Sequence, residues 1–188
     1  MTTDSVVLDT PQPVTVAFLA SLDRQPSGTW LCQPKLDGWR RLVRLSGGVV
    51  YSTPRRGGTG DGRPLPPEIV RAVQDSPWLE GLGLDCEWVG PRRAGQPHSL
   101  HVFDLFSDQR FSERYVRLSL FPWPKKNLRL VPCWGNHGMV ERFYEQLQDP
   151  ASEGLVVRRA DSRLVGGVNP LWFKVKFRAA ERQVRHGV

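Results

Sequence analysis

The stretch Lys35-Leu36-Asp37-Gly38-Trp39-Arg40 is the part of the sequence on which the interpretation of the whole chain depends. It lies between two apolar stretches of strand length, residues 30–33 and 39–45. Asp followed by Gly favours a tight turn between two such strands. Taken alone, the six residues are therefore explained by a charged β-turn around Asp37 and Gly38.

Around this turn, short apolar stretches bounded by Gly or Pro predict further strands. The predicted strands cover residues 30–33, 39–45, 49–52, 82–89, 100–106, 154–158 and 172–177. We expect the first three to form an antiparallel meander, with the turn Ser46-Gly47-Gly48 between the second and third. Apolar spacing predicts helices over residues 14–22, around residues 69–73, and over 139–147.

Strands outnumber helices and are joined by tight turns, which favours the α+β class, with antiparallel β-sheets flanked by helices, over a doubly wound α/β fold. At 188 residues the chain is the length of one ordinary domain with a buried core. We therefore expect residues 1–188 to form a single domain.

The composition indicates a polyanionic partner and an intracellular location. Lys and Arg number 26 against 19 Asp and Glu, a net charge of +7, which favours binding to phosphates through counterion release. No apolar run approaches the roughly 20 residues that span a bilayer, so no membrane association is expected. No basic region precedes an apolar stretch at the N-terminus, which predicts a cytoplasmic protein. The three cysteines are widely spaced and are expected to be reduced, packed thiols.

Further short patterns follow Lys35–Arg40 in a fixed order. They are Asp85-Cys86-Glu87, Phe103-Asp104, Glu153-Gly154-Leu155-Val156-Val157-Arg158 and Lys174-Val175-Lys176. The pattern K-x-D-G-x-R alone would arise by chance in about one chain of this length per thousand, but five elements in order are improbable. Over residues 33–176 the sequence resembles the covalent nucleotidyltransferase superfamily, which comprises ATP-dependent DNA ligases, RNA ligases and messenger-RNA capping enzymes.

The resemblance implies that Lys35 is the catalytic nucleophile. Its amine would capture the α-phosphate of ATP as a phosphoramidate that stores the energy of the departing pyrophosphate. Arg40 and Glu87 would bind the ribose and Phe103 would stack on the adenine, while Gln33 would contact the edge of the base. Without the resemblance, Phe103 would be assigned to the core, and Arg40 and Glu87 to an exposed salt bridge.

The resemblance also implies residues for the phosphates, the metal and the nucleic acid. Lys174 and Lys176 would contact the α-phosphate, and Glu153 would bind Mg²⁺. Three arginines in the Gly- and Pro-rich loop after residue 53 are candidates for the phosphate backbone beside a nick, or form a solvated loop: Arg55, Arg56 and Arg63. His98 and His101 lack further ligands at zinc-like spacing, so we expect no histidine to bind a metal.

The branch of the superfamily follows from details of these patterns. Glu153 followed by glycine favours a ligase over a capping enzyme, which would use GTP. Two stretches resemble DNA ligases more than RNA ligases: Phe103-Asp104-Leu105-Phe106, and Arg158-Arg159-Ala160-Asp161-Ser162 leading to Trp172-Phe173-Lys174. Two features depart from the family: Cys86 replaces a glycine, and the sequence ends a dozen residues after Lys176, so we expect no OB-fold domain.

Three hypotheses follow from the resemblance. The first, which we favour, is a minimal monomeric ATP- and Mg²⁺-dependent ligase that acts on nicked or broken DNA, or, as an alternative, on RNA. The second is a core that works with a protein partner supplying the contacts of an OB-fold. The third is a ligase-like nucleic-acid-binding protein without turnover.

Overall fold

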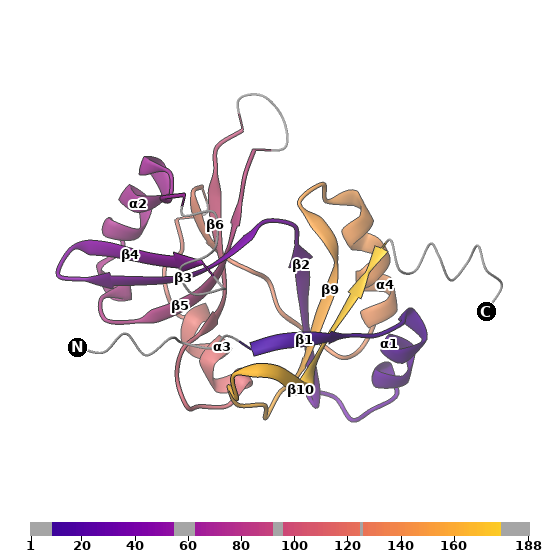
Figure 1. Cartoon of the computed structure of the whole chain (residues 1–188). Helices are drawn as coiled ribbons and strands as arrows, with labels where there is room; N and C mark the ends of the chain where they lie inside the picture. The colour runs from indigo at the N-terminus through magenta and orange to yellow at the C-terminus, as the bar shows by residue number, and fades with distance from the viewer. Residues whose placement is uncertain (1–8, 55–62, 92–95, 125, 178–188) are drawn as a thin grey trace. The chain divides into compact units, whose positions relative to one another are not determined.

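The computed structural model describes residues 9–54, 63–91, 96–124 and 126–177 (Figure 1). These residues divide into two compact units. Unit 1 comprises Gly38–Gln109 and Glu113–Val131, and unit 2 comprises Asp9–Asp37, Arg110–Ser112 and the described part of Pro132–Val188. Each unit has its own five-stranded sheet and its own hydrophobic core.

The sheet of unit 1 has the strand order β4-β3-β5-β6-β7. Its strands are β3 (Trp39–Ser46), β4 (Val49–Pro54), β5 (Gly83–Val89), β6 (Ser99–Leu105) and β7 (Leu128–Leu130). All neighbours are antiparallel except the edge pair β6 and β7. The turn between β3 and β4 uses Gly47 and Gly48, both with positive φ, a conformation that glycine adopts without steric cost.

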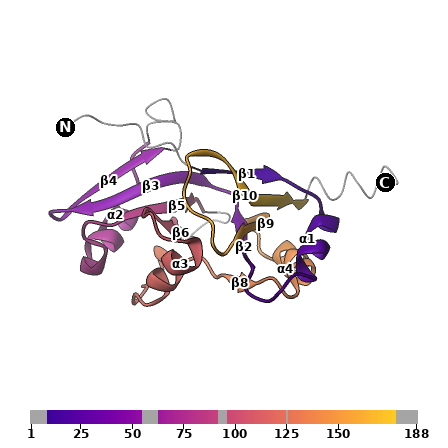
Figure 2. The ribbon, with the colours of Figure 1, turned by 90° about the horizontal axis from the view of Figure 1, so that it is seen from below.

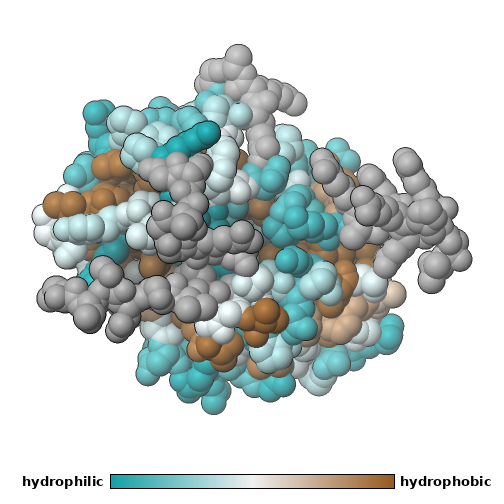
Figure 3. Space-filling view, viewed as in Figure 1, coloured by the Kyte–Doolittle hydropathy of each residue, from teal (hydrophilic) through white to brown (hydrophobic). Residues whose placement is uncertain are grey.

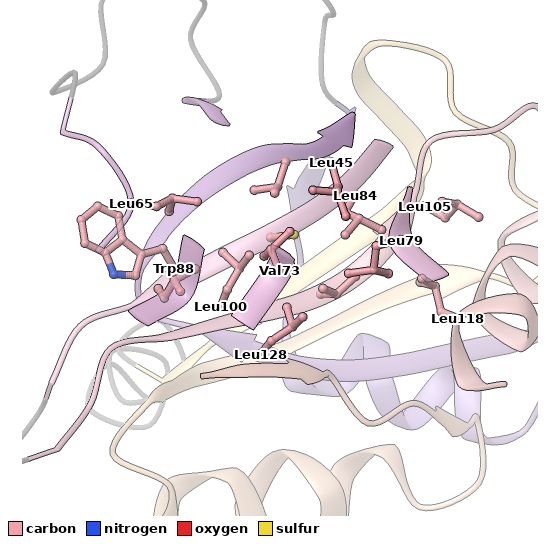
Figure 4. Close-up of a cluster of buried hydrophobic side chains, with 14 residues drawn as sticks. Leu45, Leu65, Val73, Leu79, Leu84, Trp88, Leu100, Leu105, Leu118 and Leu128 are labelled. Carbon is pink, nitrogen blue, oxygen red and sulfur yellow. The ribbon is translucent and has the colours of Figure 1, made fainter. Parts of the chain in front are cut away.

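One face of this sheet carries the core of unit 1, which Figure 4 shows in close-up. Val43 and Leu45 alternate inward along β3, and Ile69 and Val73 of helix α2 (Pro67–Gln74) pack against them. Helix α3 (Phe111–Ser119) adds Leu118, and the short helix η1 (Pro77–Leu79) adds buried residues at the same face. Because strand side chains alternate, the residues that lie between these core residues along β3, β5 and β6 point to the opposite face.

The sheet of unit 2 has the strand order β1-β10-β9-β2-β8. Its strands are β1 (Asp9–Pro13), β2 (Trp30–Leu36), β8 (Trp134–Gly135), β9 (Ser152–Arg159) and β10 (Gly167–Lys176). Helices α1 (Val16–Asp23) and α4 (Met139–Glu145), the latter followed by η2 (Gln146–Gln148), lie side by side in Figure 2. Their apolar side chains pack on Cys32, Leu155 and Val157 of the sheet.

A buried amide fixes the end of α1. The side chain of Asn136 donates to the carbonyls of Leu22 and Gln25 at 3.1 and 3.0 Å and accepts from the amide of Gly28 at 3.0 Å. The carboxylate of Asp23 accepts from the amide of Met139 at 2.9 Å, at the first turn of α4. These bonds satisfy backbone groups that the helix ends would otherwise leave without partners.

The predicted α+β class is confirmed, and the predicted strands and helices are found with shifted ends. Both sheets are mixed rather than purely antiparallel, because β1 pairs in parallel with β10 and β6 with β7. The predicted three-strand meander was wrong. Strand β2 pairs with β9 and β8 in unit 2, whereas β3 and β4 form a hairpin in unit 1, because the chain leaves one sheet after Asp37 and enters the other at Gly38.

Two further features concern the surface. Figure 3 shows apolar atoms at its left edge, over the β3–β4 hairpin, and β4 exposes about half of the side chains of Val49 and Tyr51. Among the described residues no helix is both long and apolar enough to cross a membrane.

Cys32 and Cys86 are buried free thiols and Cys133 is a half-buried one.

Candidate active site

Lys35 shares one face of the unit 2 sheet with three other predicted site residues. The pairing register places Lys35 opposite Gly154 of β9, and Gly154 opposite Lys176 of β10. Gln33 of β2 and Lys174 of β10 each lie two residues before the lysine of the same strand, and both pair with Val156 of β9. Directly paired residues point to the same face, as do alternate residues of a strand. The register therefore brings four predicted residues together on the face opposite the core.

Glu153 joins this cluster because of a bulge in β9. The register shifts between Lys35 and Leu36, which leaves Glu153 as the extra residue opposite them. Its Oε1 accepts a hydrogen bond from Nζ of Lys35, and its Oε2 accepts one from Nζ of Lys176 at 2.8 Å. One carboxylate thus connects the predicted nucleophile to a predicted phosphate-binding lysine.

The charges of this cluster depend on one another. Burial alone would raise the pKa of the Glu153 carboxyl, but the hydrogen bonds from Lys176 and Lys35 outweigh burial and hold this pKa below its usual value. Glu153 is therefore ionised at neutral pH and lies between two ammonium groups. An amine, a carboxylate and further cations on one surface are suited to neutralising and positioning a phosphate chain.

Gly154 allows the strands of this cluster to approach one another. Its φ is +146°, and a Cβ built there would lie 1.9 Å from the carbonyl oxygen of Val175 on β10. The hydroxyl of Ser152 lies 3.4 Å from the carbonyl oxygen of Lys35 and 3.2 Å from that of Gly154. Only glycine fits this position without moving β10 and the lysine at its end.

Unit 1 carries the other predicted nucleotide residues on the face opposite its core. The guanidinium of Arg40 forms a two-point ion pair with Asp85, with Nε 2.8 Å from Oδ1 and Nη2 bonded to Oδ2. Burial alone would lower the pKa of Arg40, but Asp85 and then Glu87 raise it above the usual value. Arg40 pairs in register with Glu87, so both point to the same face.

Phe103 reaches this face through a second bulge. Asp85 pairs with Asp104 and Cys86 with Val102, so Phe103 is the extra residue on β6. The guanidinium of Arg40 lies 5.4 Å from the centre of the Phe103 ring. The aromatic ring that the sequence assigned to adenine stacking therefore lies beside the arginine assigned to the ribose.

Gly38 has a similar role in unit 1 to that of Gly154 in unit 2. A Cβ at Gly38 would lie 2.4 Å from the carbonyl oxygen of Trp88 and 3.0 Å from Cγ of Glu87. Glycine here lets β3 and β5 approach closely beside Arg40 and Glu87, which lie directly opposite each other on these strands. The close approach explains why this position of the pattern is glycine.

The remaining predicted residues differ in burial, and two of them are not described by the structure. Gln33 is buried with 3% of its surface exposed, and Arg63 is exposed. Arg55 and Arg56 lie outside the described residues. Within the described ranges, no group of three or more His, Cys, Asp and Glu side chains could hold a metal ion.

Sequence reasoning did not assign roles to Asp85 and Ser152. Asp85 is two residues before Glu87, so alternation along a strand already placed both carboxylates on one face with Arg40. That signal could have identified the ion pair with Arg40. Ser152 precedes a bulge, and no feature of the sequence indicated that its hydroxyl would bond to the carbonyl of Lys35.

Solved structures of similar fold are ligases. The ligase domain of LigD from M. tuberculosis matches with a TM-score of 0.69 at 22% identity, over 94% of this chain and 61% of that one. The ATP-dependent DNA ligase of bacteriophage T7 in complex with ATP matches with a TM-score of 0.61 at 14% identity, over 92% and 69% of the two chains. This chain has the fold of an ATP-dependent ligase nucleotidyltransferase domain.

The ligase nucleotidyltransferase fold is shared by enzymes that act on different nucleic acids. An archaeal ATP-dependent RNA ligase matches with a TM-score of 0.58 at 14% identity, over 95% of this chain and 50% of that one. The chain thus spans about three-fifths of the LigD ligase domain and half of the RNA ligase. No protein-family model and no curated protein matches the sequence.

Proposed function

We propose that this protein is an ATP-dependent polynucleotide ligase that carries AMP on Lys35. The observation that supports this most directly is the cluster of Lys35, Glu153 and Lys176, in which the nucleophile of the K-x-D-G-x-R pattern is hydrogen-bonded to a carboxylate shared with a second lysine. The ligase fold and the face of unit 1 that carries Arg40 and Phe103 support the same function.

The first step forms the covalent intermediate. The ammonium of Lys35 releases a proton to water and parts from Glu153, and its Nζ then attacks the α-phosphorus of ATP. A P–N bond forms while the bond from the α-phosphorus to the bridging oxygen breaks, and pyrophosphate leaves. Lys174 and Lys176, on the same face, neutralise charge on the phosphate oxygens, which favours the transition state.

Two transfers to nucleic acid follow. An oxygen of a 5′-phosphate attacks the phosphorus of lysyl-AMP, which breaks the P–N bond and forms a pyrophosphate link between AMP and the strand. A 3′-hydroxyl then attacks the activated 5′-phosphate, AMP leaves, and the strands are joined. Favourable orientation of the two strand ends supplies much of the rate enhancement in such a reaction.

The residues of the cluster fit a magnesium ion shared with the substrate. Magnesium is often bound by one or two carboxylates together with substrate phosphates, which matches the single carboxylate of Glu153 on a phosphate-binding face. When bound, the ion would neutralise negative charge on the phosphates and stabilise the charge that develops during transfer. Glu153, whose carboxylate accepts hydrogen bonds from Lys35 and Lys176, would be the residue that holds the ion.

The residues of unit 1 hold the nucleoside in this proposal. Phe103 stacks on the adenine, a contact worth about 1–3 kcal/mol for bases on aromatic rings. Arg40 and Glu87 contact the ribose, and Asp85 fixes the guanidinium of Arg40 in one orientation. The buried amide of Gln33, on unit 2, is assigned to the edge of the base because it can both donate and accept.

The decisive experiment measures the intact mass of the protein after incubation with ATP and Mg²⁺. We expect a gain of one AMP, lost in acid because a phosphoramidate is acid-labile. Lys35→Ala should gain nothing, whereas Lys126→Ala, which removes an exposed lysine outside the cluster, should gain AMP like the unaltered protein. No gain in the unaltered protein, or a gain in Lys35→Ala, would show that the nucleophile is wrongly assigned.

The preference for DNA over RNA rests on the sequence around Phe103 and Arg158. A nicked duplex that already carries 5′-linked AMP tests sealing apart from the loading of Lys35. We expect an all-DNA nick to be sealed faster than one with RNA strands. Faster sealing of the RNA-containing nick would favour the RNA ligase alternative, and AMP loading with GTP preferred over ATP would indicate a capping enzyme.

Salt-sensitive binding to nucleic acid without AMP transfer would favour the third hypothesis, a binding protein without turnover. If AMP loading were slow but sealing of the pre-adenylated nick were fast, a partner that assists the first step would be indicated. Addition of candidate partners to the loading reaction would then identify one that restores its rate.

A further inference from the structure

Arg40, Glu87 and His101 form a row of directly paired residues across the sheet of unit 1. Arg40 on β3 pairs with Glu87 on β5, and Glu87 pairs with His101 on β6. Directly opposite residues point to the same face, with Cβ atoms about 4.5–5.5 Å apart. His101 therefore lies next to Glu87 on the face assigned to the nucleoside.

The ring of His101 is held in place by a buried hydroxyl. Ser99 lies two residues earlier on β6, has 7% of its surface exposed, and places Oγ 2.8 Å from Nε2 of His101. Two residues later on the same strand, the bulge places Phe103 on the same face. His101 thus lies on β6 between a residue that orients its ring and the residue assigned to the base.

The position of His101 in this row identifies the part of the nucleotide that it would meet. The proposed function assigns Phe103 to the base, and Lys174 and Lys176 to the phosphates. Arg40 and Glu87, the neighbours of His101 in the row, are assigned to the ribose. An imidazole with one ring nitrogen protonated can donate to or accept from a hydroxyl, so its chemistry suits a sugar.

We propose that His101 contacts a ribose hydroxyl of the bound nucleotide and contributes to discrimination against nucleotides that lack this hydroxyl. This inference rests on the proposed function, because it requires ATP to bind on this face of unit 1. It adds a residue that the sequence patterns left unassigned, and it gives Ser99 the role of a positioning residue. A site that hydrogen-bonds a hydroxyl binds a ligand that lacks this hydroxyl more weakly.

Equilibrium binding tests the inference without the covalent step. Titration calorimetry would compare ATP, 2′-deoxy-ATP and 3′-deoxy-ATP on the Lys35→Ala protein with and without His101→Ala. We expect His101→Ala to weaken ATP binding by about threefold to tenfold, the range for one hydrogen bond. Binding of the analogue that lacks the contacted hydroxyl should be unchanged, because it has already lost this bond.

Matched variants separate this contact from a general loss of structure. Ser99→Ala should weaken ATP binding in the same direction but less, because the ring remains and only its orientation is freed. His101→Gln should restore part of the affinity, since an amide also donates and accepts. His137→Ala removes an exposed histidine of unit 2 and should leave all three affinities unchanged. Thermal melting by circular dichroism would verify that each variant is folded.

The outcomes distinguish the two proposals. Equal weakening for all three nucleotides, no weakening at all, or the absence of ATP binding by Lys35→Ala would each overturn the assignment of His101. If ATP binds and His101→Ala acts as expected, but the unaltered protein gains no AMP, the ligase proposal fails while the ribose contact stands.

Discussion

Two residues of the nucleotidyltransferase patterns do no chemistry, and the structure explains both. Gly38 and Gly154 each lie where a strand of the site approaches its neighbour so closely that a Cβ would overlap a backbone carbonyl oxygen. The overlap is worse at Gly154, which also has a positive φ. Both glycines flank side chains that we assign to the site, and they fix the distance between the strands that carry those side chains.

Gly154→Ala should therefore destabilise the protein strongly. The Cβ would overlap the carbonyl oxygen of Val175, and alanine at this φ is strained, so we expect a loss of about 3 kcal/mol or more in the free energy of unfolding. Gly135→Ala is the matched control, because a Cβ at that position meets nothing within 4 Å; its change should stay below about 1 kcal/mol. Urea denaturation measures both. Similar midpoints for the two variants would contradict this account of Gly154.

At the scale of elements, a buried ion pair links α3 to β6. Arg114 of α3 forms a two-point ion pair with Asp104 of β6, at 2.8 and 2.9 Å, and both side chains are 1% exposed. Asp104 directly follows Phe103, and its Oδ1 also accepts from the amide of Leu105 at 2.8 Å. The pair therefore fixes the end of β6 immediately beside the bulge that positions Phe103.

Asp104→Asn should destabilise the protein because it leaves the guanidinium of Arg114 buried without a countercharge. Breaking a buried pair from one side typically costs about 3–5 kcal/mol. The matched control is Asp161→Asn, which breaks the exposed pair of Arg159 and Asp161 and should produce no measurable change. Guanidinium denaturation would compare the two variants. A double variant, Asp104→Leu with Arg114→Met, should recover much of the loss, and a failure to recover would mean that the ion pair itself is required.

The same ion pair shows what the sequence could and could not predict about elements. Phe111, Arg114 and Leu118 form the buried face of α3 at helical spacing, but a buried arginine in the middle conceals the apolar period, so the helix was missed. The two bulges were also missed, because they are properties of how two strands pair. The strands around Lys35, Arg40 and Glu153 were predicted because their apolar alternation is local, but the predicted strands 30–33 and 154–158 did not extend to Lys35 and Glu153.

At the scale of the whole molecule, the order of the short patterns predicted more than any single residue did. The ligase fold was predicted from five patterns spread between Gln33 and Lys176, although the chains of known structure share only 14–22% identity with this one. What the patterns did not predict is that their residues divide between two compact units, with Lys35, Glu153 and Lys176 in one and Arg40, Glu87 and Phe103 in the other. The three-strand meander was wrong for this reason.

The net charge of +7 is a property of the whole chain, and its effect on nucleic-acid binding is measured by varying the salt concentration. We expect the affinity for a nicked duplex to fall steeply with salt, with a slope of log K against log salt of about −0.9 for each phosphate contacted. If exposed Arg63 contacts one phosphate, Arg63→Ala should reduce the steepness of this slope by about one unit and weaken binding equally for unrelated sequences. Arg71→Ala, which removes an exposed arginine of α2, should leave the slope unchanged. Fluorescence anisotropy over a salt series measures the slopes. Equal slopes for the unaltered protein and Arg63→Ala would remove this residue from the nucleic-acid contact, and the charge that binds the duplex would then have to come from other residues.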